Sequence, residues 1–232
     1  MRIIPVLDLK DGLVVRAQAG RRDEYRPIET PLSESADPLA VAEGLRGLHP
    51  FGAFYCADLD AIEGRPPNSS AVKRLCGMTD PPAIWLDAGF GKPSVLESAF
   101  RDPLVHPVLG TESQHDERLL REFAAHPRLV LSLDFFADGY RGPGEILDSA
   151  DAWPNTVIVM TLERVGTDGG PDFELLRAIR QRAGNRKVAA AGGARHAGDI
   201  EMLSGMGVDA VLMATALHGA KLTPSQLTAL QA

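Results

Sequence analysis

Short apolar runs alternate with amphipathic segments along the whole chain. The apolar runs are the length of buried strands and cover residues 3–8, 53–58, 83–87, 105–110, 129–134, 156–161, 187–191 and 209–213. Helical periodicity follows each run, over residues 38–48, 69–75, 93–101, 115–125, 144–153, 172–182, 197–206 and 224–230. Repeated strand–helix units predict a parallel sheet, and eight of them is the number that closes a (β/α)8 barrel. A doubly wound open sheet is the alternative.

An internal repeat favours the barrel. Asp8 and Asp134 each end an apolar run in Leu-Asp, and each is followed closely by an Asp-Gly turn. Three further loops match in register between the halves: Pro67-Asn68 with Pro171-Asp172, Ala88-Gly89 with Ala191-Gly192, and Gly110-Thr111 with Ala214-Thr215. Four matches in order are a poor fit to chance. We therefore expect one domain over residues 1–232, built from half-barrels of about 1–125 and 126–232.

Composition narrows the classes of function. The 232 residues are 44% hydrophobic and 24% charged, with a formal net charge of -7, which suits a globular protein that does not bind nucleic acid. Cys56 and Cys76 lack metal-ligand spacing and are expected to be reduced thiols, which favours a cytoplasmic location. The histidines do not cluster, so no metal site is predicted. Neither a signal peptide nor a membrane-spanning run is expected.

The candidate chemistry lies at the ends of the predicted strands. In such barrels the active site is built there, so Asp8 and Asp134 are expected to share one mouth as an acid and base pair. The alternative is that each carboxylate only caps its own loop. Thr161 ends the sixth run, where its hydroxyl could orient a substrate, although a β-branched residue also simply suits a strand.

Phosphate binding is predicted after the seventh and eighth strands, where barrels commonly hold it. The residues there are Gly192, Gly193, Ala214 and Thr215, and small residues let backbone N–H groups approach an anion. A glycine pair can also be no more than a tight turn. The expected ligand is a small phosphorylated metabolite, with no cofactor. Residues 19–35 form a long non-periodic stretch, which is either functional or mobile.

These residues resemble the HisA/HisF family of histidine biosynthesis over nearly the whole chain. The markers are residues 7–16, 58–60, 63–68, 110–111, 132–134, 161, 192–193 and 207–211. The resemblance implies that Asp8 is the general base, Asp134 the general acid and Thr161 a supporting residue in an Amadori rearrangement of a phosphorylated aminosugar. It also implies substrate contacts at Arg16 in the first loop, and at Gly89, Gly110 and Thr111 in the N-terminal half.

The chain departs from the family pattern at the phosphate loops of its N-terminal half. Asp87 replaces the first glycine of a triple-glycine loop, and Glu112 follows Gly110-Thr111 where a small residue is usual. Two carboxylates repel a phosphate dianion unless a cation such as Lys92 compensates. We therefore expect phosphate binding in the C-terminal half alone, and a monophosphate substrate with an amine or other positive group at the opposite end.

Three other classes of function are weighed from the sequence, and a protein partner is considered beside them. One is a paralogue outside histidine biosynthesis, for example in cofactor biosynthesis. Another is a barrel that binds a phosphometabolite without catalysis. A Schiff-base aldolase is disfavoured, because Lys10 and Lys92 are predicted to lie in loops rather than at strand ends facing the core. Docking of a glutaminase subunit has no support in these residues.

Overall fold

The computed structural model describes residues 1–167 and 169–231 of the chain. Among these residues, eight parallel strands form a closed ring, because β1 pairs with both β4 and β11. The prediction of a (β/α)8 barrel, or TIM barrel, is confirmed. In ring order the strands are β1 (Arg2–Lys10), β4 (Ala53–Asp58), β5 (Ala83–Asp87), β6 (Val105–Gly110), β7 (Val130–Phe136), β9 (Thr156–Thr161), β10 (Lys187–Ala191) and β11 (Ala210–Met213).

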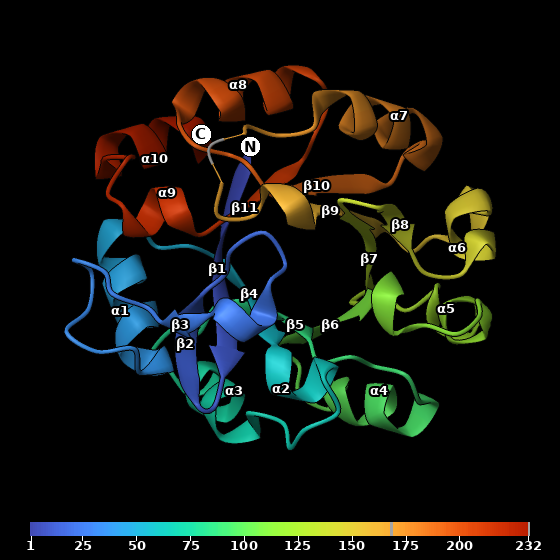
Figure 1. Cartoon of the computed structure of the whole chain (residues 1–232), viewed down its shortest axis with the longest axis horizontal. Helices are drawn as coiled ribbons and strands as arrows, with labels where there is room; N and C mark the ends of the chain where they lie inside the picture. The colour runs from blue at the N-terminus through green and yellow to red at the C-terminus, as the bar shows by residue number, and fades with distance from the viewer. Residues whose placement is uncertain (168, 232) are drawn as a thin grey trace.

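Helices surround this ring on the outside (Figure 1). The first, α1, begins after Asp37 as predicted, and the Asp37 carboxylate accepts the N–H groups of Leu39 and Ala40 at 3.1 Å each. The longer helices are α1 (Pro38–Leu48), α3 (Ser69–Cys76), α4 (Pro93–Ala99), α5 (Arg118–Phe123), α7 (Phe173–Ala183), α8 (Ala197–Gly205) and α10 (Pro224–Gln231). Short helices are α2 (Leu59–Ile62), α6 (Gly144–Asp148) and α9 (Thr215–His218), with 3-10 turns η1 (Arg22–Glu24), η2 (Thr111–Ser113), η3 (Ala150–Ala152) and η4 (Leu162–Arg164).

Helix ends differ from the prediction at three places. The helix expected over residues 144–153 is divided into α6 and η3, and those expected over 93–101 and 115–125 are shorter at one or both ends. In the last case α5 begins at Arg118, whose backbone N–H donates to the Asp116 carboxylate at 2.9 Å.

Two strands continue past their aspartates and form hairpins that the sequence pattern did not predict. β1 reaches Lys10 and pairs antiparallel with β2 (Leu13–Arg16), so the placement of Lys10 in a loop was wrong. β7 likewise reaches Phe136 and pairs with β8 (Gly139–Arg141). In both halves the barrel strand pairs first with the preceding barrel strand and then, beyond the end of that pairing, with its hairpin partner. This shared feature matches the half-barrel repeat. The boundary between the halves stays a prediction.

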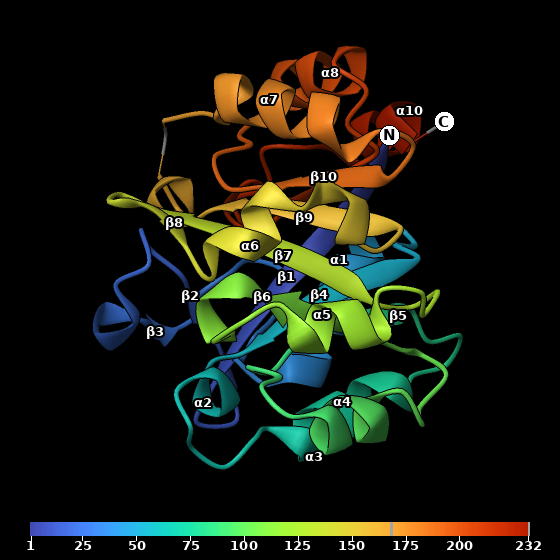
Figure 2. The same cartoon turned by 90° about the vertical axis from the view of Figure 1, so that its right-hand side faces the viewer.

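The hairpins mark one end of the barrel. Figure 2 shows β2, β3 (Arg26–Pro27) and β8 together at that end, with both termini at the opposite end. There the N-terminal amine donates to the carbonyl oxygen of Leu230 at 2.9 Å, which attaches α10 to β1. None of the helices in the described part of the chain is both long enough and apolar enough to cross a bilayer.

Strand alternation decides which side chains face the barrel interior. One buried cluster fills the inside of the ring and contains Ile4, Tyr55, Trp85, Val108 and Val130. The other lies between the strands and the helices and contains Ile3, Leu7, Leu9, Leu131 and Leu133. Because successive side chains of a strand point to opposite faces, every second residue after Ile4, Trp85 and Val130 faces inward. This period places Asp8, Asp87 and Asp134 on the inside of the barrel.

Candidate active site

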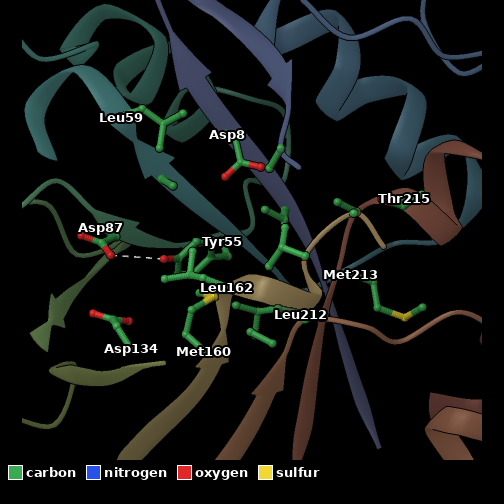
Figure 3. Close-up of a pocket in the computed structure, with 18 of the residues that line it drawn as sticks. Asp8, Tyr55, Leu59, Asp87, Asp134, Met160, Leu162, Leu212, Met213 and Thr215 are labelled. Carbon is green, nitrogen blue, oxygen red and sulfur yellow. Dashed lines mark hydrogen bonds between the residues drawn. The ribbon is translucent and has the colours of Figure 1, made fainter. Parts of the chain in front are cut away.

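A pocket opens at the C-terminal ends of the strands, between the two hairpins. Its empty space, including the open mouth, is about 890 Å³. Asp8, Asp87, Glu112 and Asp134 contribute carboxylates to its wall. Figure 3 shows Asp8 on one side of this pocket, Asp87 and Asp134 together on the other, and Tyr55 between them. The structure therefore brings the two predicted catalytic aspartates into a common pocket, and adds a third carboxylate from β5.

Asp134 is held by hydrogen bonds on both carboxylate oxygens. Its Oδ1 accepts the hydroxyl of Ser132 at 2.6 Å, and its Oδ2 accepts the backbone N–H of Glu112 at 3.0 Å and the Thr111 hydroxyl at 3.3 Å. Thr111 Oγ1 also accepts the backbone N–H of Asp134. Asp134 is 3% exposed, so water cannot replace these hydrogen-bond partners unless the surrounding residues rearrange. The partners therefore fix the orientation of the carboxylate.

Asp87 lies on the same wall, next to Asp134. Its Oδ2 accepts the Tyr55 hydroxyl at 3.2 Å, and its Oδ1 accepts the backbone N–H of Gly89 at 3.2 Å. A Cβ built on Gly110 would lie 3.1 Å from Asp87 Oδ2 and 3.3 Å from Asp134 Oδ2. Gly110 thus leaves room for both carboxylates, and its predicted contact with substrate stays a prediction.

Burial raises the pKa of all three aspartates. Desolvation is the main cause for Asp8, whose pKa reaches about 7 and is lowered only by the Arg22 charge. The pKa of Asp134 is also raised to about 7, first by burial and then by the charge of Asp87. Burial raises the pKa of Asp87 to about 6, opposed by its hydrogen bond from Gly89. Groups that titrate near neutral pH suit proton transfer in both directions.

Arg22, Tyr25 and Tyr55 also line the pocket, and sequence reasoning did not select them as site residues. Arg22 lies in η1, and Tyr25 is the residue that directly follows η1. Both belong to the non-periodic stretch over residues 19–35. The length of that stretch was the available signal, because a long loop in a compact barrel is commonly functional. Tyr55 lies in an apolar strand, where the sequence does not distinguish a tyrosine that faces a pocket from one that is a core residue.

The loops after β10 and β11 form the opposite end of the pocket. Gly192, Gly193, Ala214 and Thr215 all line it, as predicted for a phosphate cradle. The glycine pair has φ values of +101° and +85°, and a Cβ on Gly193 would lie 2.2 Å from the carbonyl oxygen of Gly170. Both glycines are therefore required by backbone packing alone. Whether they also bind phosphate stays a prediction.

Five predicted site residues do not line the main pocket. Thr161 follows the inward-facing Met160, so strand alternation directs the Thr161 side chain outward. The backbone of Thr161 lies against the Gly192 loop, because a Cβ on Gly192 would be only 2.4 Å from the Thr161 carbonyl oxygen. Gly110 and Thr111 support Asp134 and Asp87 from behind, and Gly89 donates to Asp87. Arg16 lines a smaller adjoining cavity that also contains Asp8 and Thr215.

The charge of the pocket is uneven. Its acidic wall is opposed by the Arg22 guanidinium, whose Nη2 donates to Glu112 Oε1. Lys92 does not line the pocket and lies exposed before α4, so Arg22 and not Lys92 compensates the carboxylates. The remaining lining is mostly apolar, from residues such as Leu59, Leu162 and Leu212. Within the described ranges, no three His, Cys, Asp or Glu side chains are grouped so as to hold a metal ion.

The fold agrees with the family comparison. The model of the family described as "Histidine biosynthesis protein" matches residues 2–223, so the chain belongs to this family, which is the HisA/HisF family. It is 32% identical over 223 residues to Uncharacterized protein MJ0703 of Methanocaldococcus jannaschii, covering 94% of this chain and 93% of that protein.

Two further relatives are named as imidazole-4-carboxamide isomerases whose substrate name contains two 5-phosphoribosyl groups. The one from Salinibacter ruber is 28% identical over 235 residues, with coverage of 93% of this chain and 88% of the relative. The one from Bacillus cereus strain AH820 is 28% identical over 234 residues, with coverage of 94% and 93%. These similarities support the resemblance stated from the motifs.

Proposed function

We propose that the chain is a HisA-like isomerase that catalyses an aldose–ketose rearrangement of a phosphorylated aminosugar. The observation that carries this proposal is the placement of Asp8 and Asp134 in one pocket, on strands that are opposite in the ring. The named isomerases among the relatives support the reaction class. No cofactor is needed, because the substrate is oxidised at one carbon and reduced at the next.

Two carboxylates are sufficient for the steps. Asp134 protonates the ring oxygen, the bond from that oxygen to the first carbon breaks, and the amine nitrogen forms a Schiff base to this carbon. Asp8 then removes the proton from the second carbon, which gives an enol. Tautomerisation returns a proton to the first carbon and leaves a ketone at the second. Asp134 must start protonated and Asp8 ionised, and pKa values near 7 allow both states.

The test is an isomerase assay of the purified protein with the phosphoribosyl imidazole carboxamide substrate, combined with complementation of a strain that lacks the isomerase. We expect Asp8→Asn and Asp134→Asn each to lower kcat by about 10²–10⁴-fold. The matched control is Asp138→Asn, in the β8 hairpin, where the side chain is 74% exposed. Wild-type turnover that either substitution leaves intact would refute the roles given to the aspartates.

A second candidate keeps the proton transfer but changes the substrate. Asp87 and Glu112 stand at the pocket end where a bisphosphate would place its second phosphate, and repulsion there disfavours a dianion. This supports a paralogue outside histidine biosynthesis, acting on a monophosphate. Crystals soaked in phosphate would then show density at Gly192–Gly193 alone, whereas density at both ends would contradict this candidate. Failure to complement, together with tight binding of monophosphates, would favour it over the first.

If the wild type binds a phosphometabolite without turnover, the pocket is a binding site only. In that case Asp8→Asn would leave both binding and the absence of turnover unchanged.

A further inference from the structure

An ion pair joins two loops across the mouth of the pocket. Arg22 lies in η1, between β2 and β3, and Glu112 in the turn after β6, and their side chains are only 20% and 15% exposed. Lys10 Nζ donates to the carbonyl oxygen of Arg22 at 2.8 Å, so the backbone that carries the guanidinium is also anchored. Of the described residues that line the pocket, Arg22 is the only lysine or arginine.

The loop that carries Arg22 also contacts the loop after β9. The N–H of Ala19 donates to the carbonyl oxygen of Val165 at 2.8 Å, in the loop after β9. Gly166 packs so tightly there that a Cβ on it would lie 2.4 Å from the carbonyl oxygen of Ala17. These contacts anchor the backbone of the Arg22 loop, while the guanidinium reaches Glu112 in the turn after β6.

The two ends of the pair face different aspartates. The backbone N–H of Glu112 donates to Asp134 Oδ2, which places the glutamate immediately beside the acidic wall. The Glu112 charge therefore adds to burial in raising the pKa of both Asp134 and Asp87. The Arg22 charge lowers the pKa of Asp8, against the larger effect of burial, and it lowers the pKa of Asp87 as well. The ion pair therefore adds a positive charge that favours the ionised form of Asp8 and a negative charge that favours the protonated form of Asp134.

We propose that the Arg22–Glu112 ion pair is a positioning pair that assigns opposite roles to the two aspartates, keeping Asp8 ionised as the base and Asp134 protonated as the acid. The pair takes no part in bond making. This inference rests on the proposed function, because it concerns the carboxylates that carry out the proton transfer.

Other titratable groups around the aspartates keep their charge through the neutral range. Burial raises the pKa of Tyr25 and of Tyr140 to about 12, and raises that of Tyr55 and Cys56 well above the ordinary values. The adjoining cavity holds His218, whose pKa is lowered to about 4 by burial. The groups that face Asp8 are Arg16, Arg22, Tyr25, Tyr55, Cys56 and His218, and those that face Asp134 are Tyr55, Asp87, Glu112, Tyr140 and Arg141.

Since these tyrosines, the cysteine and the histidine do not change charge between about pH 5 and pH 9, the titration in that range belongs to the aspartates. Asp87 titrates in the same range, with a pKa of about 6, and its charge acts on Asp134, so its carboxyl is followed together with those of Asp8 and Asp134 when the ion pair is altered.

The experiment is a ¹³C NMR titration of aspartate side-chain carboxyls in the full chain without substrate, assigned with Asp8→Asn and Asp134→Asn. We expect Arg22→Gln to raise the midpoint of Asp8 by about one pH unit, and Glu112→Gln to lower that of Asp134. Glutamine at 112 keeps the backbone donor to Asp134, so only the charge is lost. Arg21→Gln is the matched control, since Arg21 lies in the same loop, 54% exposed and paired with Glu24.

Two outcomes would overturn the inference: an unchanged Asp8 midpoint in folded Arg22→Gln, or shifts of Asp8 and Asp134 in the same direction in the double variant Arg22→Gln/Glu112→Gln. If a single variant does not fold, the double variant Arg22→Gln/Glu112→Gln leaves no unpaired charge and should still show Asp8 moving up and Asp134 moving down. The titration uses no substrate, so it tests the ion pair independently of turnover. Absence of the predicted midpoint shifts can therefore be told apart from failure of the isomerase assay, which tests the proposed function.

Discussion

Replacing Asp134 with asparagine should change how the stability of the protein depends on pH. The asparagine is nearly isosteric, and it can accept the Glu112 N–H while the Ser132 hydroxyl rotates to accept from its amide. What the substitution removes is the ability of this site to ionise. In the folded protein the pKa of Asp134 is raised to about 7, against an ordinary value of 3.8 that holds in the unfolded chain.

The sign and size follow from these two values. Below pH 3.8 both states are protonated and the stabilising contribution of the group is fully present. As the pH rises, the unfolded chain ionises first, so this contribution is lost between pH 3.8 and about 7. A difference of roughly three pH units at about 1.4 kcal/mol each corresponds to a loss of about 4 kcal/mol. Asp134 is 3% exposed, so solvent screening does not reduce this figure greatly.

The assay is urea unfolding of wild type and Asp134→Asn at intervals from about pH 4 to about pH 8. The free energy of unfolding of the wild type should fall relative to that of the variant by about 4 kcal/mol across this range, and the variant should be the more stable at the upper end. Asp138→Asn, at an exposed position in the same hairpin, should run parallel to wild type. Parallel curves for Asp134→Asn and wild type would refute the argument that burial of this carboxylate costs stability.

Three glycine substitutions test the packing that shapes the site and the barrel wall. Gly193→Ala should destabilise the protein by at least about 1–3 kcal/mol in urea unfolding, because its φ of +85° is left-handed and its Cβ would meet the Gly170 carbonyl oxygen at 2.2 Å; an unchanged midpoint would contradict this. In α1, Gly44→Ala should be destabilising because its Cβ would lie 2.0 Å from a backbone carbonyl oxygen of the preceding loop. Gly47→Ala in the same helix meets no atom within 4 Å and should instead stabilise by about 0.5–1 kcal/mol, so equal effects at 44 and 47 would count against the packing.

Much of the barrel could be predicted because buried parallel strands leave a strong pattern. The runs ending at Asp58, Asp87 and Thr161 match β4, β5 and β9, and the register between halves led directly to Asp8 and Asp134. Strand alternation was also available in the sequence. Applied to β9, it would have turned Thr161 away from the interior once Met160 was taken as inward-facing.

The features that were missed depend on distant contacts. The hairpin strands β2 and β8 are short, and their pairing with β1 and β7 is not encoded in local periodicity. Arg22 was visible only as one charge among several in a long loop, and its partner Glu112 is 90 positions further along the chain. Glu112 was noted as a departure from the family, but without the arginine opposite it the charge looked uncompensated.

The hairpins that branch from the barrel beside the two aspartates offer places to attach reporters. Their tips at Asp11, Gly12 and Gly139 are exposed, and both glycines there have positive φ and would bring an added Cβ within 4 Å of no other atom. Exposed turns of this kind tolerate inserted residues well. A fluorophore or spin label at each tip would therefore sit on opposite rims of the pocket, rigidly connected through about two or three residues of strand to the carboxylates whose environment it would monitor.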